Sequence, residues 1–164
     1  MDKDAIDDIL DQWSKERPEL DTAALGVVIR VMALYRSFSR EAGIALEPLG
    51  LELFEYDVLS ALRRQGKPFA LPATGLARET GLSTGAMTNR IDRLEERGLV
   101  QRQADKSDRR SVIVQLTSRG REAIDAAIQD RLDAARESLQ DLNKGERKQL
   151  ADLLRKVVLS AHDS

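Results

Sequence analysis

The chain has 164 residues, 41% of them hydrophobic and 33% charged, which is typical of one compact domain with enough apolar side chains for a core. No apolar run approaches the roughly 18 residues that span a bilayer, and no basic stretch followed by an apolar one suggests a leader, so we expect a soluble, cytoplasmic protein. The absence of cysteine excludes a disulfide framework, a thiolate metal site and a thiol redox switch.

The net charge of -2 is unevenly distributed along the sequence. Residues 1–20 contain seven acidic and three basic side chains, whereas residues 76–121 contain ten basic and six acidic ones. A phosphate backbone responds to the local field of the surface that it meets rather than to the total charge of the protein. The second segment is therefore the candidate for contact with nucleic acid.

Apolar residues at three- and four-residue spacing predict three helices in the N-terminal part of the chain. The first twelve or so residues, with apolar side chains from Ile6 to Trp13 on an acidic background, are predicted to form a short amphipathic helix in a segment that Pro18 ends. A longer helix with a broad apolar face covers residues 22–42, and Gly43 with the Pro-Leu-Gly turn that follows is expected to close it. The third helix is predicted over residues 53–64.

The next segment has the order of a helix-turn-helix. Residues 69–72 are expected to be extended, and Thr74 is the candidate cap of a short helix over 76–80. A glycine then supplies the turn. Ser83 is a good N-cap for a second helix that runs to about Arg97.

Two strands and two helices complete the predicted elements. Residues 99–102 and 112–116 are expected to form a hairpin with a charged tip at 105–110. Ser118 is the candidate cap of a long helix to about Leu142, and a last helix follows an Asn-Lys-Gly break. The predicted fold class is therefore mainly α with a small β-hairpin wing, a winged helix-turn-helix.

The helices at the two ends of the chain carry more apolar surface than one small core can cover. We expect homodimerisation through the termini, and the alternative is a monomeric helical cap. The predicted organisation is a single domain over residues 1–164. Within it, 1–48 and 118–164 form the dimerisation helices and 49–117 the DNA-binding lobe.

A helical wheel separates residues 83–97 into two faces. Met87, Ile91 and Leu94 are expected inside, and small polar side chains outside, where they approach base edges or phosphates near the positive helix N-terminus. The candidate DNA contacts are Ser83, Thr84, Gly85, Thr88, Asn89 and Arg93 of this helix and Lys106, Arg109 and Arg110 of the wing tip. The alternatives are an ordinary solvated helix face and a solvated hairpin tip, in which Asp108 pairs with one arginine.

Residues 54–117, with the wing sequence SDRRSVIVQLTSRG, resemble the MarR family of transcriptional regulators. The family-like wing motif D-x-R-x-x-x-V-x-L-T is made of Asp108, Arg110, Val114, Leu116 and Thr117. The resemblance implies an obligate, triangular homodimer that binds a pseudo-palindromic operator. Its recognition helices would enter successive major grooves, with the wings in the flanking minor grooves.

The segment STGAMTNRIDRLEERGLV and the added N-terminal helix resemble the urate-responsive, HucR/PecS-like branch of that family. This resemblance implies an effector site made of Trp13, Asp57 and Arg90, and a further acidic position of the branch falls at Gly75 here. Arg90 borders the buried face of its predicted helix, so a carboxylate partner is expected. We expect a small aromatic or anionic effector to lower operator affinity, and the glycine at position 75 weakens the case for urate itself more than the case for such an effector. Alternatively, Trp13 is an apolar anchor of the first helix and Asp57 forms a permanent ion pair with Arg90.

Other functional classes find little support in the sequence. There is no G-x-S-x-G motif, no Gly-rich phosphate loop and no metal-ligand cluster, and the single histidine, His162, lies in the tail. We therefore expect no enzyme, no cofactor and no metal. The serious alternative to a DNA-binding regulator is a helical protein-interaction module whose winged lobe does not bind DNA.

Overall fold

The computed structural model describes residues 2–105 and 111–162 of the chain. It divides into two compact units, Met1–Glu41 and Ala42–Ser164, and each unit is described by itself. The first unit contains α1 (Ala5–Glu16) and most of α2 (Ala23–Leu46). No helix among the described residues is both long and apolar enough to cross a membrane.

Arg30 of α2 holds the first unit together by binding the start of α1. Its Nε donates to the carboxylate of Asp4 at 2.8 Å, and its Nη2 donates to that of Asp7 at 2.7 Å. The same two carboxylates form the capping box of α1, because each accepts a backbone N–H of the first turn. A Cβ on Gly26 would lie 2.7 Å from Leu10 Cδ1, so α2 comes close to α1 at this point.

Attachment of α1 should weaken in acid. Hydrogen bonds from Arg30 and from the Asp7 backbone lower the pKa of Asp4 from 3.8 to about 2. Since the folded-state pKa is depressed, the stabilising contribution of this carboxylate is complete above its ordinary pKa and is lost as the pH falls through about 2. We expect the emission of Trp13, the only tryptophan, to differ between the wild type and Asp4→Asn near neutral pH and to converge in strong acid. The exposed Asp2→Asn should follow the wild type throughout, and identical emission of Asp4→Asn and wild type at neutral pH would contradict this expectation.

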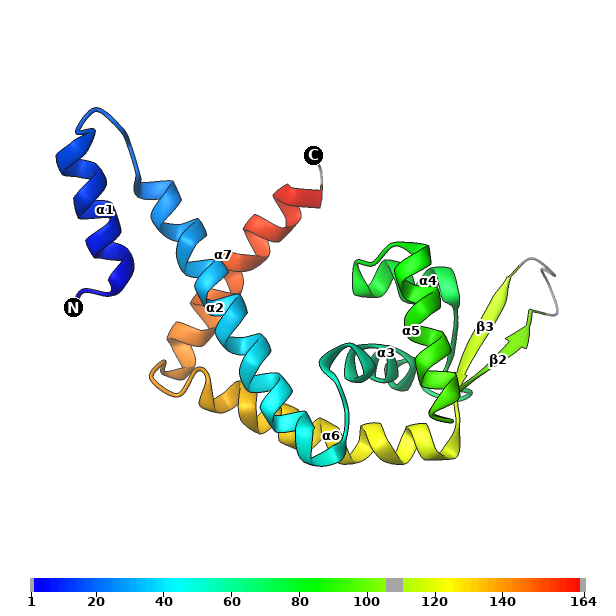
Figure 1. Cartoon of the computed structure of the whole chain (residues 1–164). Helices are drawn as coiled ribbons and strands as arrows, with labels where there is room; N and C mark the ends of the chain where they lie inside the picture. Colours follow the sequence, from blue (N-terminus) through cyan, green and yellow to red (C-terminus); the bar gives the residue numbers. More distant parts are fainter. Residues whose placement is uncertain (1, 106–110, 163–164) are drawn as a thin grey trace. The chain divides into compact units, whose positions relative to one another are not determined.

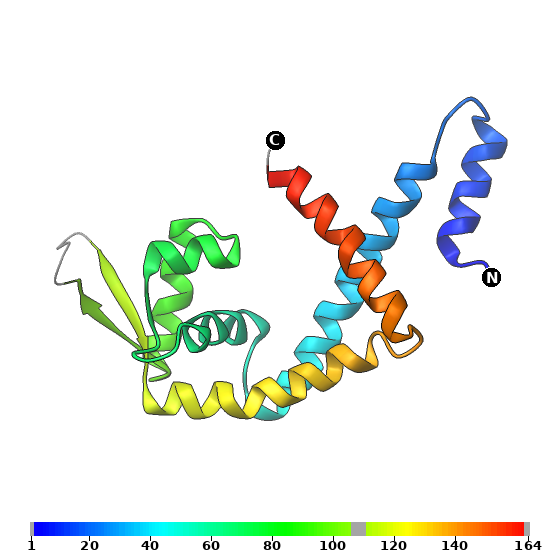
Figure 2. The same cartoon turned by 180° about the vertical axis from the view of Figure 1, so that it is seen from behind.

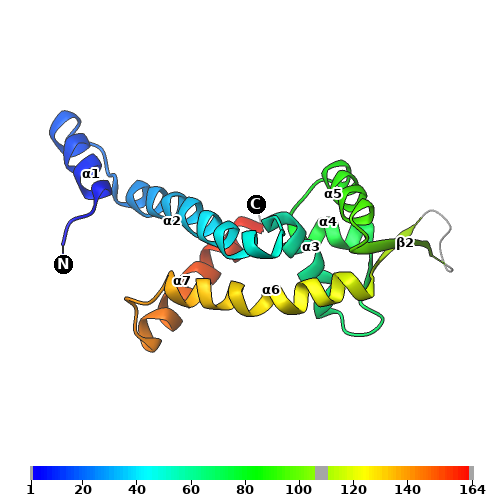
Figure 3. The ribbon, with the colours of Figure 1, turned by 60° about the horizontal axis from the view of Figure 1, so that its bottom comes forward.

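The second unit starts with the last turn of α2. The elements that follow are η1 (Glu47–Leu49), α3 (Leu53–Arg64), β1 (Ala70–Pro72), α4 (Ala73–Thr80), α5 (Thr84–Glu96), β2 (Val100–Ala104), β3 (Val112–Leu116), α6 (Ser118–Glu137) and α7 (Lys144–His162). Figure 1 shows α3, α4 and α5 gathered beside the hairpin of β2 and β3, and Figure 2 shows the same lobe from behind. Figure 3 shows α6 running along this lobe past α3.

The core of the lobe joins α3, α4, α5, the sheet and the first half of α6. Its fully buried side chains include Leu59, Leu62, Leu76, Met87, Ile91, Leu94, Val114 and Ile124. The sheet is antiparallel in the order β1-β3-β2, with Val100 opposite Leu116 and Ala70 opposite Gln115. The expected burial of Met87, Ile91 and Leu94 is confirmed.

Several predicted boundaries differ from the structure. The long helix expected to reach about Leu142 ends at Glu137, because the N–H groups of Leu139, Gln140 and Leu142 donate to carbonyls three residues back, as in turns. The second helix continues through Gly43 to Leu46, because burial of Ala42 and Leu46 on one face outweighs the helix cost of one glycine, about 1 kcal/mol. The helix predicted to follow Thr74 begins already at Ala73, directly after a strand residue, so Thr74 is not its cap. Ser118 is likewise not the cap of α6.

Thr117, the residue before Ser118, is the N-cap of α6. Its hydroxyl donates to the carbonyl of Gly98 at 2.7 Å and accepts the backbone N–H of Gly120 at 3.0 Å. This cap therefore fixes the start of α6 to the segment that leads into β2. The Thr117 side chain thus links the start of α6 directly to the residues before β2.

Large apolar side chains remain exposed on helices of both units. On α2 they are Val27, Val28, Val31, Met32, Leu34 and Tyr35, and on α7 they are Leu153, Leu154, Val157, Val158 and Leu159. Isolated exposed apolar residues are common, but a row of them along one helix is unusual for a monomer.

Candidate nucleic-acid interface

The start of α5 is presented by a tight turn from α4. Gly81 has a φ of +67°, a left-handed conformation that favours glycine, and the next N–H, of Leu82, donates to the carbonyl of Ala77 at 2.9 Å. Ser83 then caps α5 as predicted, since its side chain accepts the N–H of Ala86 at 3.3 Å. The two helices therefore have the helix-turn-helix arrangement, with the positive end of α5 free.

The predicted outward face of α5 is exposed. Ser83, Thr84, Gly85, Thr88 and Asn89 all belong to the exposed residues of the lobe. The Thr88 hydroxyl donates to the carbonyl of Thr84 at 3.0 Å, which leaves its acceptor lone pairs outward. A Cβ on Gly85 would meet nothing within 4 Å, so no contact within the chain requires a glycine at this position.

The opposite flank of α5 is docked on the start of α3 by three arginines. The guanidinium carbons of Arg90 and Arg93 lie 5.0 Å and 4.9 Å from the ring centroid of Phe54, which is cation–π range. Nη2 of Arg93 also donates to Glu52 at 2.9 Å. The side chain of Arg93, a candidate DNA contact, is thus held toward α3, although 58% of it stays exposed.

The third arginine, Arg97, binds a buried carboxylate that the sequence reading missed. Glu55 is 1% exposed, and its side chain accepts from Arg97 Nη1 and from the backbone N–H of Glu52 at 2.9 Å. Nη2 of Arg97 donates to the carbonyl of Gly50 at 2.7 Å. The spacing of Glu52 and Glu55 is that of a capping box, which is the signal that could have revealed Glu55.

The candidate effector residues are distributed over both units. Trp13 lies on α1 in the first unit and is 43% exposed. Asp57 and Arg90 lie on α3 and α5 of the second unit, and no ion pair joins these two described residues, so the expected direct pair is not formed. Partial burial raises the pKa of the Asp57 carboxyl, against the opposing charges of Arg131, Arg90 and Arg64, although Asp57 as a whole residue is exposed.

Gly75, where the resembling branch has an acid, has room for a larger side chain. A Cβ there would lie 3.7 Å from Pro72 Cδ and 3.9 Å from Leu71 Cδ2, which are ordinary contacts. The missing acid at this position therefore reflects no steric requirement of the fold.

The wing is described up to its tip. β2 and β3 are paired from Val100 with Leu116 to Ala104 with Val112. The three basic candidates of the tip, Lys106, Arg109 and Arg110, and Asp108 lie outside the described residues.

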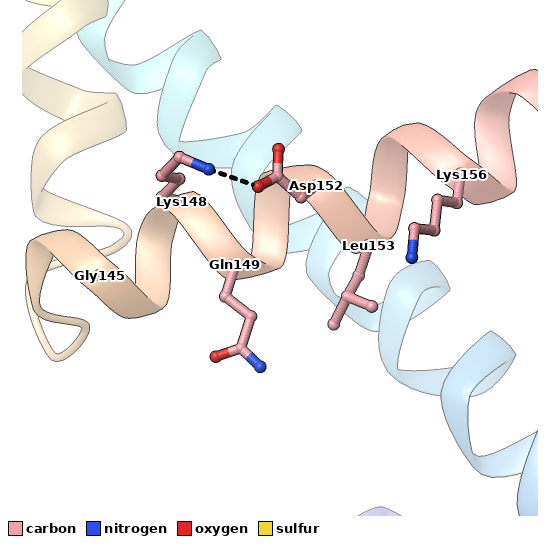
Figure 4. A pocket seen from close by; sticks show the side chains of 6 residues that line it. All are labelled: Gly145, Lys148, Gln149, Asp152, Leu153 and Lys156. Atoms are coloured by element: carbon pink, nitrogen blue, oxygen red, sulfur yellow. Dashed lines mark hydrogen bonds and ion pairs between the residues drawn. The ribbon is translucent and has the colours of Figure 1, made fainter.

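Two hollows in the second unit contain none of the candidate residues. One, of about 540 Å³, is lined by residues around η1 and the start of α3 together with Arg97. The other, of about 330 Å³, follows one face of α7, where Lys148 donates to Asp152 at 2.8 Å (Figure 4). No group of three His, Cys, Asp or Glu side chains within the described ranges could hold a metal ion.

Comparison with known proteins agrees with this geometry. The model of the MarR family matches residues 49–111, from the end of η1 into the wing. The HTH-type transcriptional regulator PecS of Dickeya dadantii is 30% identical over 152 residues, which are 93% of this chain and 92% of PecS.

Two solved structures have the same fold over most of their length. A mutant MarR from E. coli in complex with operator DNA is 26% identical, with a TM-score of 0.73 over 88% of this chain and 96% of that chain. BpsR of Bordetella bronchiseptica, whose DNA binding is regulated by 6-hydroxynicotinic acid, is also 26% identical, with a TM-score of 0.73 over 80% of this chain and 98% of that chain. With its helix-turn-helix, wing and sequence match, the chain belongs to the MarR family of winged-helix transcriptional regulators and is not an enzyme.

Proposed function

We propose that the protein is a repressor that binds a pseudo-palindromic operator as a homodimer and is released by a small aromatic or anionic effector. The observation that carries the DNA-binding part is the free N-terminal face of α5. Small polar side chains cover this face, while three arginines dock the opposite flank on α3. A helix held in this way can enter a major groove end-on.

The exposed residues at the N-terminal end of α5 and its cap have distinct roles in this proposal. Ser83 and Thr84 bind a phosphate at the helix N-terminus, where the backbone N–H groups and the helix dipole favour an anion. Asn89 reads an adenine through two hydrogen bonds, and Thr88 contacts a neighbouring base edge. Lys106, Arg109 and Arg110 of the wing tip enter the flanking minor groove. The complex of the E. coli MarR with operator DNA supports this assignment by fold.

The exposed apolar rows on α2 and α7 support the dimer. Permanent homodimers usually form because they remove such apolar side chains from water, and α2 and α7 expose many of them. In this proposal, residues 1–48 and 118–164 supply the dimerisation helices and residues 49–117 the DNA-binding lobe. A chain that stays monomeric in analytical ultracentrifugation at all concentrations would disprove it.

DNA binding is tested by measuring affinity for the DNA upstream of the protein's own gene at several salt concentrations. For a regulator, the logarithm of the binding constant should fall linearly with the logarithm of the salt concentration, because phosphate contacts release counterions. If no upstream fragment binds in a salt-dependent way, the result favours the alternative, a protein-interaction module whose winged lobe does not bind DNA.

Gly85→Ala should separate DNA binding from stability. A Cβ at this position, the methyl group of alanine, would have no atom of another part of the chain within 4 Å, and the exchange removes the helix cost of glycine, so stability should rise by up to about 1 kcal/mol. The same methyl group obstructs close approach to DNA, and we expect at least roughly tenfold weaker operator binding, which corresponds to about 1.4 kcal/mol. Thermal unfolding and fluorescence anisotropy measure the two effects. Unchanged operator affinity would remove Gly85 from the interface.

The proposed effector site is centred on Arg90 and Asp57, and the family resemblance makes Trp13 a further candidate residue. In the described part of the chain, Arg90 rests on the Phe54 ring and has no carboxylate within ion-pair distance, so its charge is available to an anion. An anion that binds there acts directly on the recognition helix. BpsR, which responds to an aromatic carboxylic acid, makes such a compound the first one to test.

Arg90→Ala and Trp13→Ala should both blunt effector release. Loss of a charge-assisted hydrogen bond costs about 1.5–3 kcal/mol, so Arg90→Ala should need roughly 10 to 100 times more effector to leave DNA. The measurement is operator release by small aromatic acids, starting with 6-hydroxynicotinic acid and urate. The exposed Arg78→Ala serves as the control. Wild-type release in both variants by a compound that releases the wild type would disprove this site.

A further inference from the structure

Arg102 connects the wing to the recognition helix through four polar contacts. It lies on β2 opposite Val114 of β3. Its backbone N–H donates to Glu95 Oε1 at 2.9 Å, and its Nη1 donates to Glu95 Oε2 at 2.6 Å. Its Nη2 lies 2.5 Å from Asp92 Oδ1 and donates to the carbonyl of Thr88 at 3.3 Å.

These contacts cover two turns of α5. The acceptors lie at positions 88, 92 and 95, so one guanidinium spans the helix from the proposed base-reading residue Thr88 toward its C-terminal end. The side chain of Arg102 is 27% exposed. Partial burial lowers the pKa of Arg102, but hydrogen bonds to Glu95 and Asp92 outweigh this effect and raise it overall, so the charge is secure.

The other polar residues of β2 bind within the sheet. Gln101 and Gln103 both donate to the side chain of Gln115 on β3, at 3.0 Å and 2.7 Å. β2 is an edge strand, and β1, on the other edge, has only three residues. A narrow ribbon of this kind twists and bends easily. Its direction relative to α5 therefore depends on side chains that reach the helix, as that of Arg102 does.

We infer that Arg102 is a positioning residue that fixes the angle between the recognition helix and the wing, so that both meet DNA as one rigid body. This inference rests on the proposed DNA binding for its functional consequence, but the clamp itself can be measured without DNA. A planar guanidinium fits this role because its fixed donors bind two carboxylates and a carbonyl at once. The ammonium of a lysine lacks such a planar arrangement of donors.

The first measurement is made on the free protein. The chain has no cysteine, so Glu96→Cys on α5 and Gln103→Cys on β2 provide a clean pair of spin-label sites. The distance distribution between the labels should be narrow with Arg102 present. The distance distribution should broaden in Arg102→Met, and in Arg102→Lys it should be intermediate between those of Arg102→Met and the wild type. The matched control Gln101→Met, also on β2, should keep it narrow. An unchanged distribution in Arg102→Met would overturn the clamp.

The second measurement is a double-mutant cycle on operator affinity. In the wild type, Arg109→Ala should remove a wing contact and weaken binding roughly tenfold. In the Arg102→Met background, the same change should weaken binding less than about threefold, because a misdirected wing no longer contributes. A merely structural role of Arg102 would leave the two losses equal.

The outcomes separate this inference from the proposed function. Lack of salt-dependent DNA binding by the wild type refutes the proposed function, and the distance distribution still decides the clamp. Restoration of wild-type binding in the triple variant Arg102→Met, Asp92→Asn, Glu95→Gln would show that neutralising two acids is sufficient, and this would overturn positioning by Arg102.

Discussion

Gly120→Ala should lower the thermal stability of the protein more than any other exchange of a glycine for alanine in a described helix. A Cβ on Gly120 would lie 1.9 Å from the carbonyl oxygen of Leu99 and 2.9 Å from its carbon. Both are backbone atoms, so no rotamer change relieves the overlap. The start of α6 would have to move away from the segment entering β2.

Such a movement breaks several contacts at once. Thr117 caps α6 and binds the carbonyl of Gly98, and Ile124 and Ala127 of α6 are fully buried in the core. Overpacking of a core costs about 1–3 kcal/mol, and a clash with fixed backbone falls at or above the upper end of this range. Because about 1 kcal/mol shifts the melting temperature of a chain of this size by about 2–4 °C, we expect a loss of roughly 10 °C.

Calorimetry or circular dichroism measures this loss, and Gly43→Ala is the matched control. Gly43 is also a helical glycine, but a Cβ there would meet nothing within 4 Å. Its replacement should leave the melting temperature unchanged or raise it slightly. A melting temperature of Gly120→Ala equal to that of the wild type would show that α6 can shift without cost.

The recognition helix could be predicted from sequence because its cap and its buried face are determined by residues close together in the chain. Ser83 stands directly before the helix, and the spacing of Met87, Ile91 and Leu94 defines the buried face without reference to the rest of the chain. The same spacing predicts Thr88 and Asn89 on the outer face, and both are exposed in the structure. One periodicity and one cap are sufficient for these assignments.

Features that depend on a distant partner could not be predicted in this way. Burial of Glu55 depends on Arg97, which lies 42 residues further along the chain. The expectation that Arg90 pairs with a carboxylate did not foresee the Phe54 ring as its neighbour. β1 is too short to show a strand period, and its three residues are defined by pairing with β3. Each of these outcomes is decided by tertiary packing.

Arg97→Met should destabilise the lobe strongly, because it leaves the Glu55 carboxylate buried without its counter-charge. Glu55 would keep only the backbone N–H of Glu52 as a hydrogen-bond donor among its present partners. Removing one member of a buried ion pair costs about 3–5 kcal/mol. Since 39% of the Arg97 side chain is exposed and solvent screens part of the interaction, we expect the lower end, about 3 kcal/mol.

The double variant Arg97→Met, Glu55→Gln tests the cause of this loss. A glutamine carbonyl can still accept the N–H of Glu52 and carries no charge that needs compensation, so the double variant should be more stable than Arg97→Met alone. Arg78→Met, which removes an exposed arginine of α4, controls for the loss of one positive charge. Urea unfolding of the wild type, Arg97→Met, Glu55→Gln and the double variant gives the coupling free energy between positions 55 and 97. Additive effects would mean that Arg97 acts by packing and by its bond to Gly50, whereas strong coupling identifies the ion pair as the element that fixes the C-terminal end of α5 to α3.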